Sequence, residues 1–351
     1  MEEIRAGIVG LGKWAEAIAA AVGRSEGIAL TACASSDPEK ARAFGDAHGC
    51  APFETYASML ADPDVRAVLV ASANPHHAGH AVAAAEAGKH VFVEKPIATT
   101  LPEARRVLEA AERAGVVLAT GQLTRRMTGV RKMKALMEEG ALGRVVMAEG
   151  NFSYPTGYNV TPDNWRWSNE TCPGGALIQL GIHHADALAY LLGEIARVQS
   201  VFRRAVVDTE IDTVTATLLE FESGAVGYLG SNFVSASLFT LDLHGTEANA
   251  YFRVEQDAFP WGRSDRLDEH SLLEIQRRGS PDRTRVPLDG GSSGARGDVL
   301  REELEEFGRC VREGGRPEVG GREGLAALGV VLAAFRSARE GRVIDFREFI
   351  R

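Results

Sequence analysis

The stretch IRAGIVGLGKWAEAIAAAV, residues 4–22, joins a short apolar run, a glycine-rich turn and an alanine-rich helical pattern. Gly10, Gly12 and Ala15 fit the spacing G-x-G-x-x-A. The first glycine permits a tight turn, the second lets a pyrophosphate approach the backbone, and the small third residue lets the helix pack closely on the strand. The helix N-terminus then offers free N–H groups to the phosphates. The stretch predicts a dinucleotide-binding turn; an ordinary glycine-rich strand-to-helix turn is the alternative.

The second strand pattern, residues 28–35, bears on which dinucleotide binds. A fold that prefers NAD usually carries an acidic residue about 20 residues past the glycines, where it binds the ribose 2′-OH. Ser35 and Ser36 stand there instead, and Asp37 with Pro38 reads as the start of a helix. The two serines are therefore expected to contact the cofactor and to favour NADP over NAD. The other turn residues expected to contact it are Leu11, Lys13 and Trp14.

Strand and helix patterns alternate as far as residue 122. Repeated units of this length predict a parallel sheet covered on both faces, hence a Rossmann domain over residues 1–122. One strand pattern breaks into a loop at Asn74-Pro75. Ala73, Asn74 and His77 are expected near the cofactor, and the alternative for His77 is an ordinary histidine at a helix start.

The stretch HVFVEKPIATT, residues 90–100, ends a buried strand with Glu94 and Lys95 directly before Pro96. Ligands bind at the carboxyl ends of the strands in open α/β sheets. Because the residue before a proline is restricted to extended conformations, the Lys95 side chain is aimed rather than free. One hypothesis for the stretch is a reactive lysine at a ligand-binding strand end, which would place Glu94 and Lys95 beside the cofactor. The alternative is a charged strand end at the surface.

The pattern changes after residue 122, and residues 123–351 are predicted to form a second α/β domain. A helix pattern at 128–143 precedes strand patterns at 144–154, 197–207, 212–223, 225–234, 238–246 and 249–255. Short turns between the later runs predict a large, mostly antiparallel open sheet with one face solvated or covered by a partner. Residues 286–298 have the composition of a flexible loop, and helices are predicted near 299–312 and 323–340.

Within this domain, the stretch PGGALIQLGIHHADALAYLLG, residues 173–193, is predicted to be helical after its two glycines. At 100° per residue, one narrow polar stripe contains Gln179, His183, Asp186 and Tyr190. His184 falls on the opposite side with the leucines, where a hydrogen-bonded core histidine is expected. The stripe carries groups suited to proton transfer, although a polar stripe also arises where a helix simply faces water.

Composition narrows the classes of partner. The formal net charge is −9 and no basic tract is present, which argues against nucleic acid. No apolar run is long enough to span a membrane, and the N-terminus lacks the features of a signal peptide. The four cysteines are widely spaced and form no metal-ligand pattern, so a cytoplasmic protein without a metal is expected.

The glycine turn, GKHVFVEKP and GGALIQLGIHHAD together resemble the Gfo/Idh/MocA oxidoreductases, the family of glucose–fructose oxidoreductase and inositol dehydrogenase, over essentially the whole chain. The resemblance implies that Lys95 is the active-site lysine, placed beside the nicotinamide, and that His183 is the catalytic histidine. Gln179 stands where many members have Asp; it cannot exchange a proton but can orient a substrate hydroxyl. The loop GYNVTPDNWRW, residues 157–167, is the expected substrate loop, with Trp165 and Arg166 as candidates.

The resemblance further implies an NAD(P)-dependent dehydrogenase or reductase of a sugar, polyol or related hydroxy compound. His183 would exchange the hydroxyl proton while Lys95 hydrogen-bonds the same oxygen. It also implies a homodimer or homotetramer formed through the second-domain sheet. Two alternatives remain: an NADPH-dependent reductase of an aromatic or dihydrodiol-type substrate, which Trp165 and Trp167 would suit, and a regulator that binds NAD(P)H without turnover.

Overall fold

The computed structural model describes residues 3–255, 264–288 and 298–351. The chain divides into two compact units. Unit 1 contains Met1–Gln122 and Asp298–Leu325, and unit 2 contains Leu123–Gly297 and Ala326–Arg351. The predicted boundary after residue 122 coincides with the first of these divisions. The predicted second domain differs, because residues 298–325 return to unit 1.

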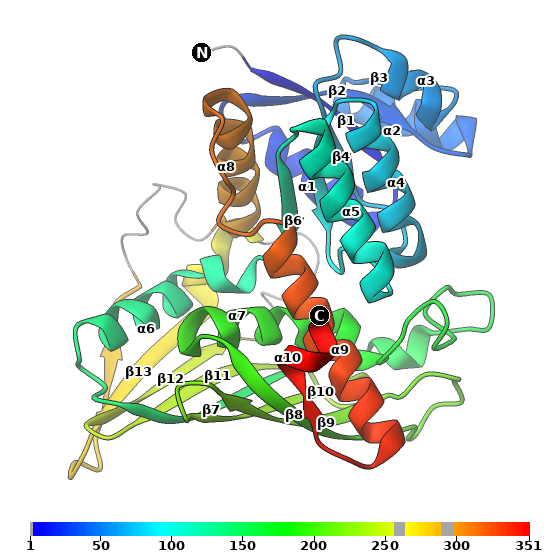
Figure 1. The fold of residues 1–351 in the computed structure, drawn as a ribbon. Helices are drawn as coiled ribbons and strands as arrows, with labels where there is room; N and C mark the ends of the chain where they lie inside the picture. Colours follow the sequence, from blue (N-terminus) through cyan, green and yellow to red (C-terminus); the bar gives the residue numbers. More distant parts are fainter. Residues whose placement is uncertain (1–2, 256–263, 289–297) are drawn as a thin grey trace. The chain divides into compact units, whose positions relative to one another are not determined.

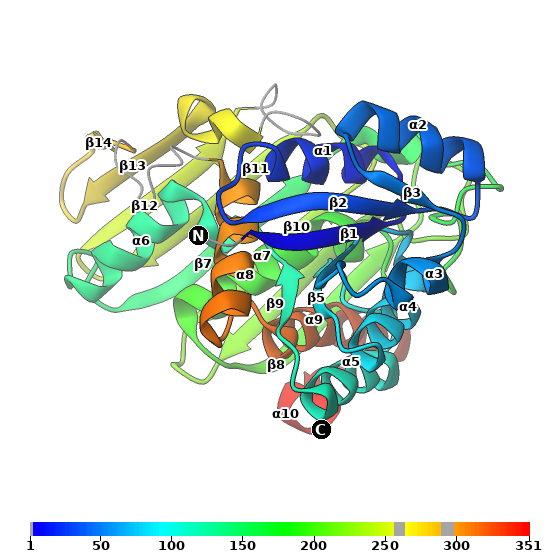
Figure 2. The ribbon, with the colours of Figure 1, turned by 90° about the horizontal axis from the view of Figure 1, so that it is seen from above.

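In its described part, unit 1 is built on a six-stranded, wholly parallel sheet with the strand order β3-β2-β1-β4-β5-β6. The order reverses between β1 and β4, which creates the switch point where such sheets bind ligands. Figure 2 shows β1 and β2 side by side. The strands are β1 (Ile4–Val9), β2 (Ile28–Ala34), β3 (Ala51–Phe53), β4 (Ala67–Val70), β5 (His90–Glu94) and β6 (Leu118–Gly121).

The helices of this sheet begin where the sequence supplies caps. Asp37 caps α2 by accepting hydrogen bonds from the backbone of Glu39 and Lys40, as predicted. The expected Asn74-Pro75 loop is wrong: both residues lie in the first turn of α4, where a proline is tolerated. The helices are α1 (Lys13–Val22), α2 (Pro38–His48), α3 (Tyr56–Ala61), α4 (Asn74–Glu86) and α5 (Leu101–Ala114).

Helix α8 (Val299–Glu313) belongs to unit 1 for a physical reason. Its apolar face, which includes Leu300, Leu304 and Phe307, is fully buried in the core cluster of β1, β2 and α1. The Phe307 ring meets Phe92 of β5 edge-on, with centroids 5.9 Å apart. Arg24 also hydrogen-bonds Asp298, the N-cap of α8, at 2.9 Å. The segment therefore completes a core that residues 1–122 leave open.

Among the described residues, unit 2 contains a nine-stranded sheet in the order β14-β13-β12-β11-β7-β10-β9-β8-β15. Among the strand pairs described in this sheet, only β10–β7 is parallel, so the predicted mostly antiparallel sheet is confirmed. The strands are β7 (Val145–Ser153), β8 (Ile195–Arg203), β9 (Val214–Phe221), β10 (Val226–Asn232), β11 (Leu238–Gly245), β12 (Ala248–Val254), β13 (Ser271–Arg277), β14 (Arg283–Val286) and β15 (Ile344–Asp345).

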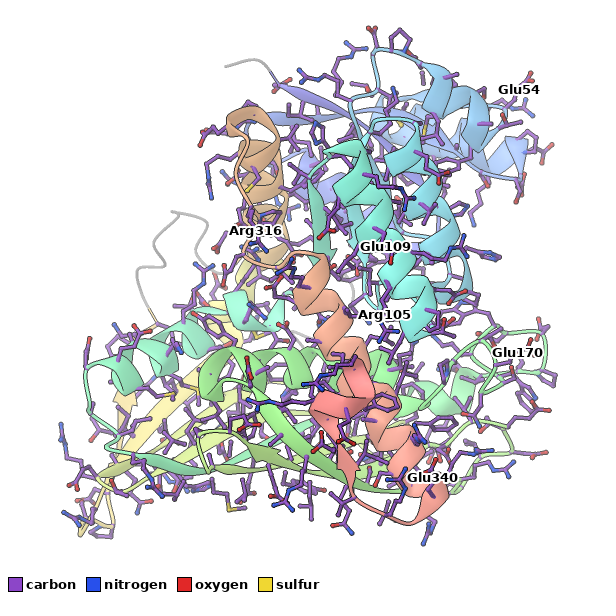
Figure 3. The ribbon with its side chains drawn as sticks, in the orientation of Figure 1. Glu54, Arg105, Glu109, Glu170, Arg316 and Glu340 are labelled. Atoms are coloured by element: carbon purple, nitrogen blue, oxygen red, sulfur yellow. The ribbon has the colours of Figure 1, made fainter. Side chains whose placement is uncertain are left out.

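One face of this sheet is covered by helices. Figure 1 shows α6 (Thr128–Glu138) and α7 (Ile182–Leu192) along it. Helix α10 (Phe346–Ile350) packs on β8 and β15, and α9 (Gly321–Glu340) contacts β8. Phe239 and Phe252 are buried beneath the helices. No described helix of unit 2 lies on the opposite face, whose side chains extend outward (Figure 3). Most of the expected flexible loop, 286–298, lies outside the described residues.

Candidate active site

The glycine turn of unit 1 has the geometry that a pyrophosphate requires. Gly10 has φ +88°, and a Cβ there would lie 2.2 Å from the backbone of Ser72, so a side chain is excluded. A Cβ on Gly12 would meet no described atom within 4 Å, so this side of the turn is open. Gly12 is also the N-cap of α1 and contributes no side-chain cap to its first N–H groups. These residues fit a dinucleotide phosphate.

The end of β2 carries serine hydroxyls at the position where NAD-preferring folds usually have an acidic residue that binds the ribose. Ser35 Oγ accepts a hydrogen bond from the Asp37 backbone N–H at 3.1 Å, and Ser36 is exposed. The Asp37 carboxylate accepts from two backbone N–H groups of α2, at 3.0 and 3.2 Å. Asp37 is thus engaged as a helix cap, and the two serines are the polar side chains beside it.

His77, expected near the cofactor, joins the ends of two strands. Its Nδ1 lies 2.6 Å from the Pro96 carbonyl oxygen and its Nε2 lies 2.8 Å from that of Ser72. Burial lowers the pKa of His77, and the neutral ring can donate to only one of these carbonyls. Both ring nitrogens therefore face the protein, which favours a structural role. Asn74, at the start of α4, is buried.

Glu94 ends β5 as a buried carboxyl, 5% exposed. Its Oε2 accepts a hydrogen bond from the Lys95 backbone N–H at 3.2 Å, and a Cβ on Gly121 would lie 2.8 Å from its Oε1. Burial raises the pKa of Glu94 to about 7, opposed by the Trp14 indole and the charge of Lys95. Lys95 itself is half-buried, and the Lys95–Pro96 peptide bond is cis. A hydrogen bond between the Trp14 indole and the Glu94 carboxyl therefore connects the start of α1, directly after the glycine turn, to the end of β5.

The predicted polar stripe of unit 2 begins on a π-helical turn, Leu177–Gly181, and continues on α7. The expectation of one uniform α-helix is wrong, because a wider turn precedes His183. Gln179 and His183 remain on successive turns, four residues apart. Gln179, His183 and Asp186 are buried by the protein, so this part of the stripe does not arise from a solvated helix face.

Asp186 on the same helix holds an arginine that the sequence interpretation missed. Arg125 donates to both carboxylate oxygens, from Nε at 2.8 Å and from Nη2 at 2.6 Å. The Arg125 guanidinium also lies 5.2 Å from the centroid of the Tyr190 ring. The adjacent pair Arg125-Arg126 is visible in the sequence, but only the structure shows that both residues are buried. Asp186 and Tyr190 thus serve to anchor α7.

His184 is fully buried and structural, as its position among the leucines predicted. Its Nε2 lies 2.9 Å from the Thr240 carbonyl oxygen, and its ring packs edge-on against Phe239 at 4.6 Å. Burial lowers the pKa of His184 to about 4, so the ring is neutral near pH 7. The neighbouring His183 lies near Phe152, with ring centroids 6.2 Å apart.

The structure brings three of the expected substrate residues together. Arg166 Nε donates to Gln179 Oε1 at 3.3 Å, and the guanidinium stacks on the Trp165 ring at 4.2 Å from its centroid. Tyr158 of the same loop is exposed, and its hydroxyl bonds the Val234 carbonyl oxygen. In unit 2, Trp165, Arg166 and Gln179 are therefore in contact, and His183 follows Gln179 by four residues on the same helical segment.

The described residues contain neither a cluster of metal ligands nor a membrane-spanning helix. Among them, no group of three or more His, Cys, Asp and Glu side chains could hold a metal ion. No helix among the same residues has the length and apolar character needed to cross a bilayer.

A parallel sheet with an open phosphate cradle at its switch point is the architecture of NAD(P)-dependent enzymes. Residues 4–122 match the model described as "Oxidoreductase family, NAD-binding Rossmann fold", and residues 130–251 match the GFO/IDH/MocA C-terminal domain. The chain belongs to the Gfo/Idh/MocA family, as the sequence resemblance predicted, and it is an NAD(P)-dependent oxidoreductase.

Named relatives agree with this assignment. The crystal structure of a putative NADPH-dependent oxidoreductase from Desulfitobacterium hafniense is 36% identical, covers 100% of both chains and has a TM-score of 0.94. The aldose–aldose oxidoreductase of Caulobacter crescentus is 26% identical, with a TM-score of 0.86 over 98% of this chain and 100% of that one. The 1,5-anhydro-D-fructose reductase of Ensifer adhaerens is 26% identical over 92% of each chain.

Proposed function

We propose that this enzyme interconverts a CH–OH group and a carbonyl on a sugar, polyol or related hydroxy compound, with NADP(H) preferred over NAD(H). The observation that carries the proposal is the buried His183, preceded by a hydrogen-bonding Gln179, in a chain whose other unit has a dinucleotide cradle. Named relatives such as 1,5-anhydro-D-fructose reductase and myo-inositol 2-dehydrogenase support a substrate of this class.

In this proposal His183 exchanges the proton of the reacting hydroxyl, since imidazole is suited to proton transfer near neutral pH. Lys95 donates a hydrogen bond to the same oxygen and stabilises the negative charge that develops on it. Gln179 cannot exchange a proton, and it orients a substrate hydroxyl instead. The nicotinamide, when bound, supplies the hydride acceptor or donor.

The cofactor preference rests on the end of β2. Its polar side chains are the hydroxyls of Ser35 and Ser36, and the Asp37 carboxylate is engaged in capping α2. A ribose 2′-phosphate therefore meets hydroxyl donors with little carboxylate repulsion. Titration of NADP(H) and NAD(H) by fluorescence tests this directly. Tighter binding of NAD(H) would show that another group reads the ribose.

The test of the activity is a panel of polyols, aldoses and ketoses with NADP⁺ or NADPH, monitored through absorbance of the reduced nicotinamide. Turnover of at least one member supports the proposal. Cofactor binding without turnover of any member supports the regulator alternative. The aromatic-substrate alternative has less support, because the Trp165 ring expected to receive such a substrate is stacked against a guanidinium.

We also propose that two copies associate through the uncovered face of the unit 2 sheet. Cross-strand pairs place the apolar side chains of Val201, Ala216, Leu218, Tyr228 and Val226 on this face. Val201, Leu218 and Val226 are 53%, 56% and 47% exposed, which is a costly arrangement for neighbouring residues that stay in water. The expected cytoplasmic location stays a prediction from cysteine usage.

A further inference from the structure

Arg166 is a partly buried cation that the proposed reaction does not yet use. Its Nε donates to the neutral amide oxygen of Gln179, and one face of its guanidinium stacks on Trp165. No carboxylate oxygen of the described residues lies within 4.0 Å of it, and its two Nη groups bond no described protein atom. Burial lowers the pKa of Arg166, and the nearby Cys172 thiol acts in the opposite direction.

The carboxylates on the same loop do not neutralise this charge. Asp163 is exposed, and its Oδ1 accepts a hydrogen bond from Thr161 at 2.6 Å. Glu170, labelled in Figure 3, is exposed at the other end of the loop. Elsewhere in unit 2, the buried Arg125 is held by both oxygens of Asp186. Arg166 therefore differs from Arg125 in having an amide where a carboxylate would balance it.

The Arg166 side chain is also held in place before any ligand arrives. Its backbone N–H donates to Asn164 Oδ1 at 2.9 Å, and the Trp165 carbonyl oxygen accepts from Thr171 Oγ1 at 2.5 Å. The stacking ring and the Gln179 amide fix the plane of the guanidinium. A preorganised guanidinium loses little conformational entropy when it binds a planar anion such as a carboxylate, or the oxygens of a phosphate.

Gln179 connects this cation to the reacting centre. Gln179 and His183 are four residues apart on successive turns, so the two side chains are neighbours along one helix face. An anionic group bound at Arg166 would therefore lie close to the substrate carbon whose hydroxyl meets His183. A carboxylate at position 179 would compete with such a ligand for the guanidinium, whereas glutamine leaves the positive charge available.

We propose that Arg166 is a specificity-determining residue that binds the carboxylate or phosphate of an anionic sugar, and that Gln179 preserves its charge for this purpose. The proposal rests on the proposed function for its placement of the reaction at His183. The substrate class is then a sugar acid or a sugar phosphate rather than a neutral sugar or polyol.

The first experiment compares matched compounds that differ only in the anionic group: D-glucose, D-glucuronate and D-glucose 6-phosphate, and the pair D-glucitol and D-gluconate. With the preferred cofactor, at least one anionic compound should exceed its neutral partner about 100-fold in kcat/KM. A substrate without the anionic group leaves the desolvated Arg166 cation unpaired. The carboxylate and phosphate arms distinguish the two sources of charge. Higher kcat/KM for the neutral members would overturn the proposal.

The second experiment uses variants. Arg166→Gln should lower kcat/KM for the anionic compound about tenfold or more beyond its effect on the neutral partner, and Arg166→Lys should restore part of this preference. Gln179→Glu should reduce the preference by pairing with Arg166. The matched control is Arg278→Gln, an exposed arginine of the same unit, which should change neither rate. Equal loss for both classes in Arg166→Gln would contradict the inference.

A third measurement separates this inference from the proposed function. Trp165 lies directly under the guanidinium, so binding of D-gluconate, D-glucuronate or D-glucose 6-phosphate to the protein with bound cofactor should alter tryptophan fluorescence, and Arg166→Gln should weaken that binding. If no compound is turned over but this Arg166-dependent binding is seen, the proposed function fails and the inference stands. If neither neutral nor anionic compounds bind differently in wild type and Arg166→Gln, the inference fails.

Discussion

Both carboxylate oxygens of Asp186 are engaged by the guanidinium of Arg125, at 2.8 and 2.6 Å, one helical turn beyond His183. The two side chains are 1% and 9% exposed. The pair links the segment before α6 to the middle of α7, so it fixes the helix that carries His183. Its geometry is bidentate, which is the arrangement that best offsets the desolvation of two buried charges.

Removal of one member of this pair should destabilise the protein strongly. Asp186→Asn leaves the Arg125 charge buried without its counter-charge, and a loss of about 3–5 kcal/mol in the free energy of unfolding is expected. Urea denaturation followed by circular dichroism measures it. A double Arg125→Leu, Asp186→Leu variant should lose less than Asp186→Asn, since no buried charge remains. A single variant of unchanged stability would mean that water reaches this pair.

The two adjacent histidines should separate on mutation. His183→Ala is expected to keep the fold and to cut turnover by roughly 10²–10⁴-fold, the usual effect of losing a general acid/base. His184→Ala should act through stability, by about 1–3 kcal/mol, because it leaves the Thr240 carbonyl oxygen without its partner. Kinetics and thermal melts of both variants check this. A turnover defect confined to His184→Ala would refute the assignment.

Lys95→Ala should resemble His183→Ala if both residues act on one substrate oxygen, as proposed. The double variant should then lose less than the product of the two single losses, because residues that act as a unit are not additive. Steady-state kinetics on the four proteins give the coupling. Cofactor titration of Lys95→Ala serves as the control for a loss of binding. Multiplicative losses would indicate that the two side chains act independently.

Glu94 should make stability depend on pH. Since burial raises its pKa to about 7 in the folded state, folding favours the protonated carboxyl, and this contribution is present below the unfolded pKa near 4.5 and lost as pH rises through 7. Glu94→Gln removes the titration, so its stability relative to wild type should increase between pH 4.5 and 8 by up to about 3 kcal/mol. Denaturation at several pH values tests the slope. Parallel pH profiles of the two proteins would disprove it.

The uncovered sheet face should govern assembly. Leu218→Asp places a charge among Tyr228, Val226 and Val201, and it should convert the assembly expected for wild type to monomer at micromolar concentration. Light scattering with size-exclusion chromatography measures the mass. Val343→Asp, at another exposed apolar residue, is the matched control and should leave the mass unchanged. A monomeric wild type would exclude the proposed interface.

Features set by neighbouring residues were predictable from the sequence. The positive φ of Gly10 and the cap at Asp37 are local properties of the chain, and both occur where the sequence placed them. His184 was predicted to lie in the core because the angular spacing of helical residues places it on the same side as the neighbouring leucines. Most strands of unit 2 were also predicted, since alternation along one strand reports its buried face. Strands β3, β13, β14 and β15 were not predicted.

Other features depend on contacts that local patterns do not encode. The π-helical turn at Leu177–Gly181 replaces an expected α-helix, because the surrounding packing decides which carbonyl each N–H reaches. The Arg125–Asp186 pair joins residues that are 61 positions apart. The bond from Arg166 to Gln179 depends on the path of an irregular loop. Local propensity contains no information on such partners, so these parts of the candidate site required the structure.

The return of α8 to unit 1 has a consequence for synthesis on the ribosome. When residue 122 has been made, the strands of the first sheet exist, but the surface that Leu304 and Phe307 cover is still exposed to water. The whole of unit 2 as far as residue 297 must be translated before that surface is covered. The core of unit 1 is therefore completed only after most of unit 2 has been made, although residues 326–351 of unit 2 follow later still. Until then the nascent chain exposes an apolar surface that can aggregate.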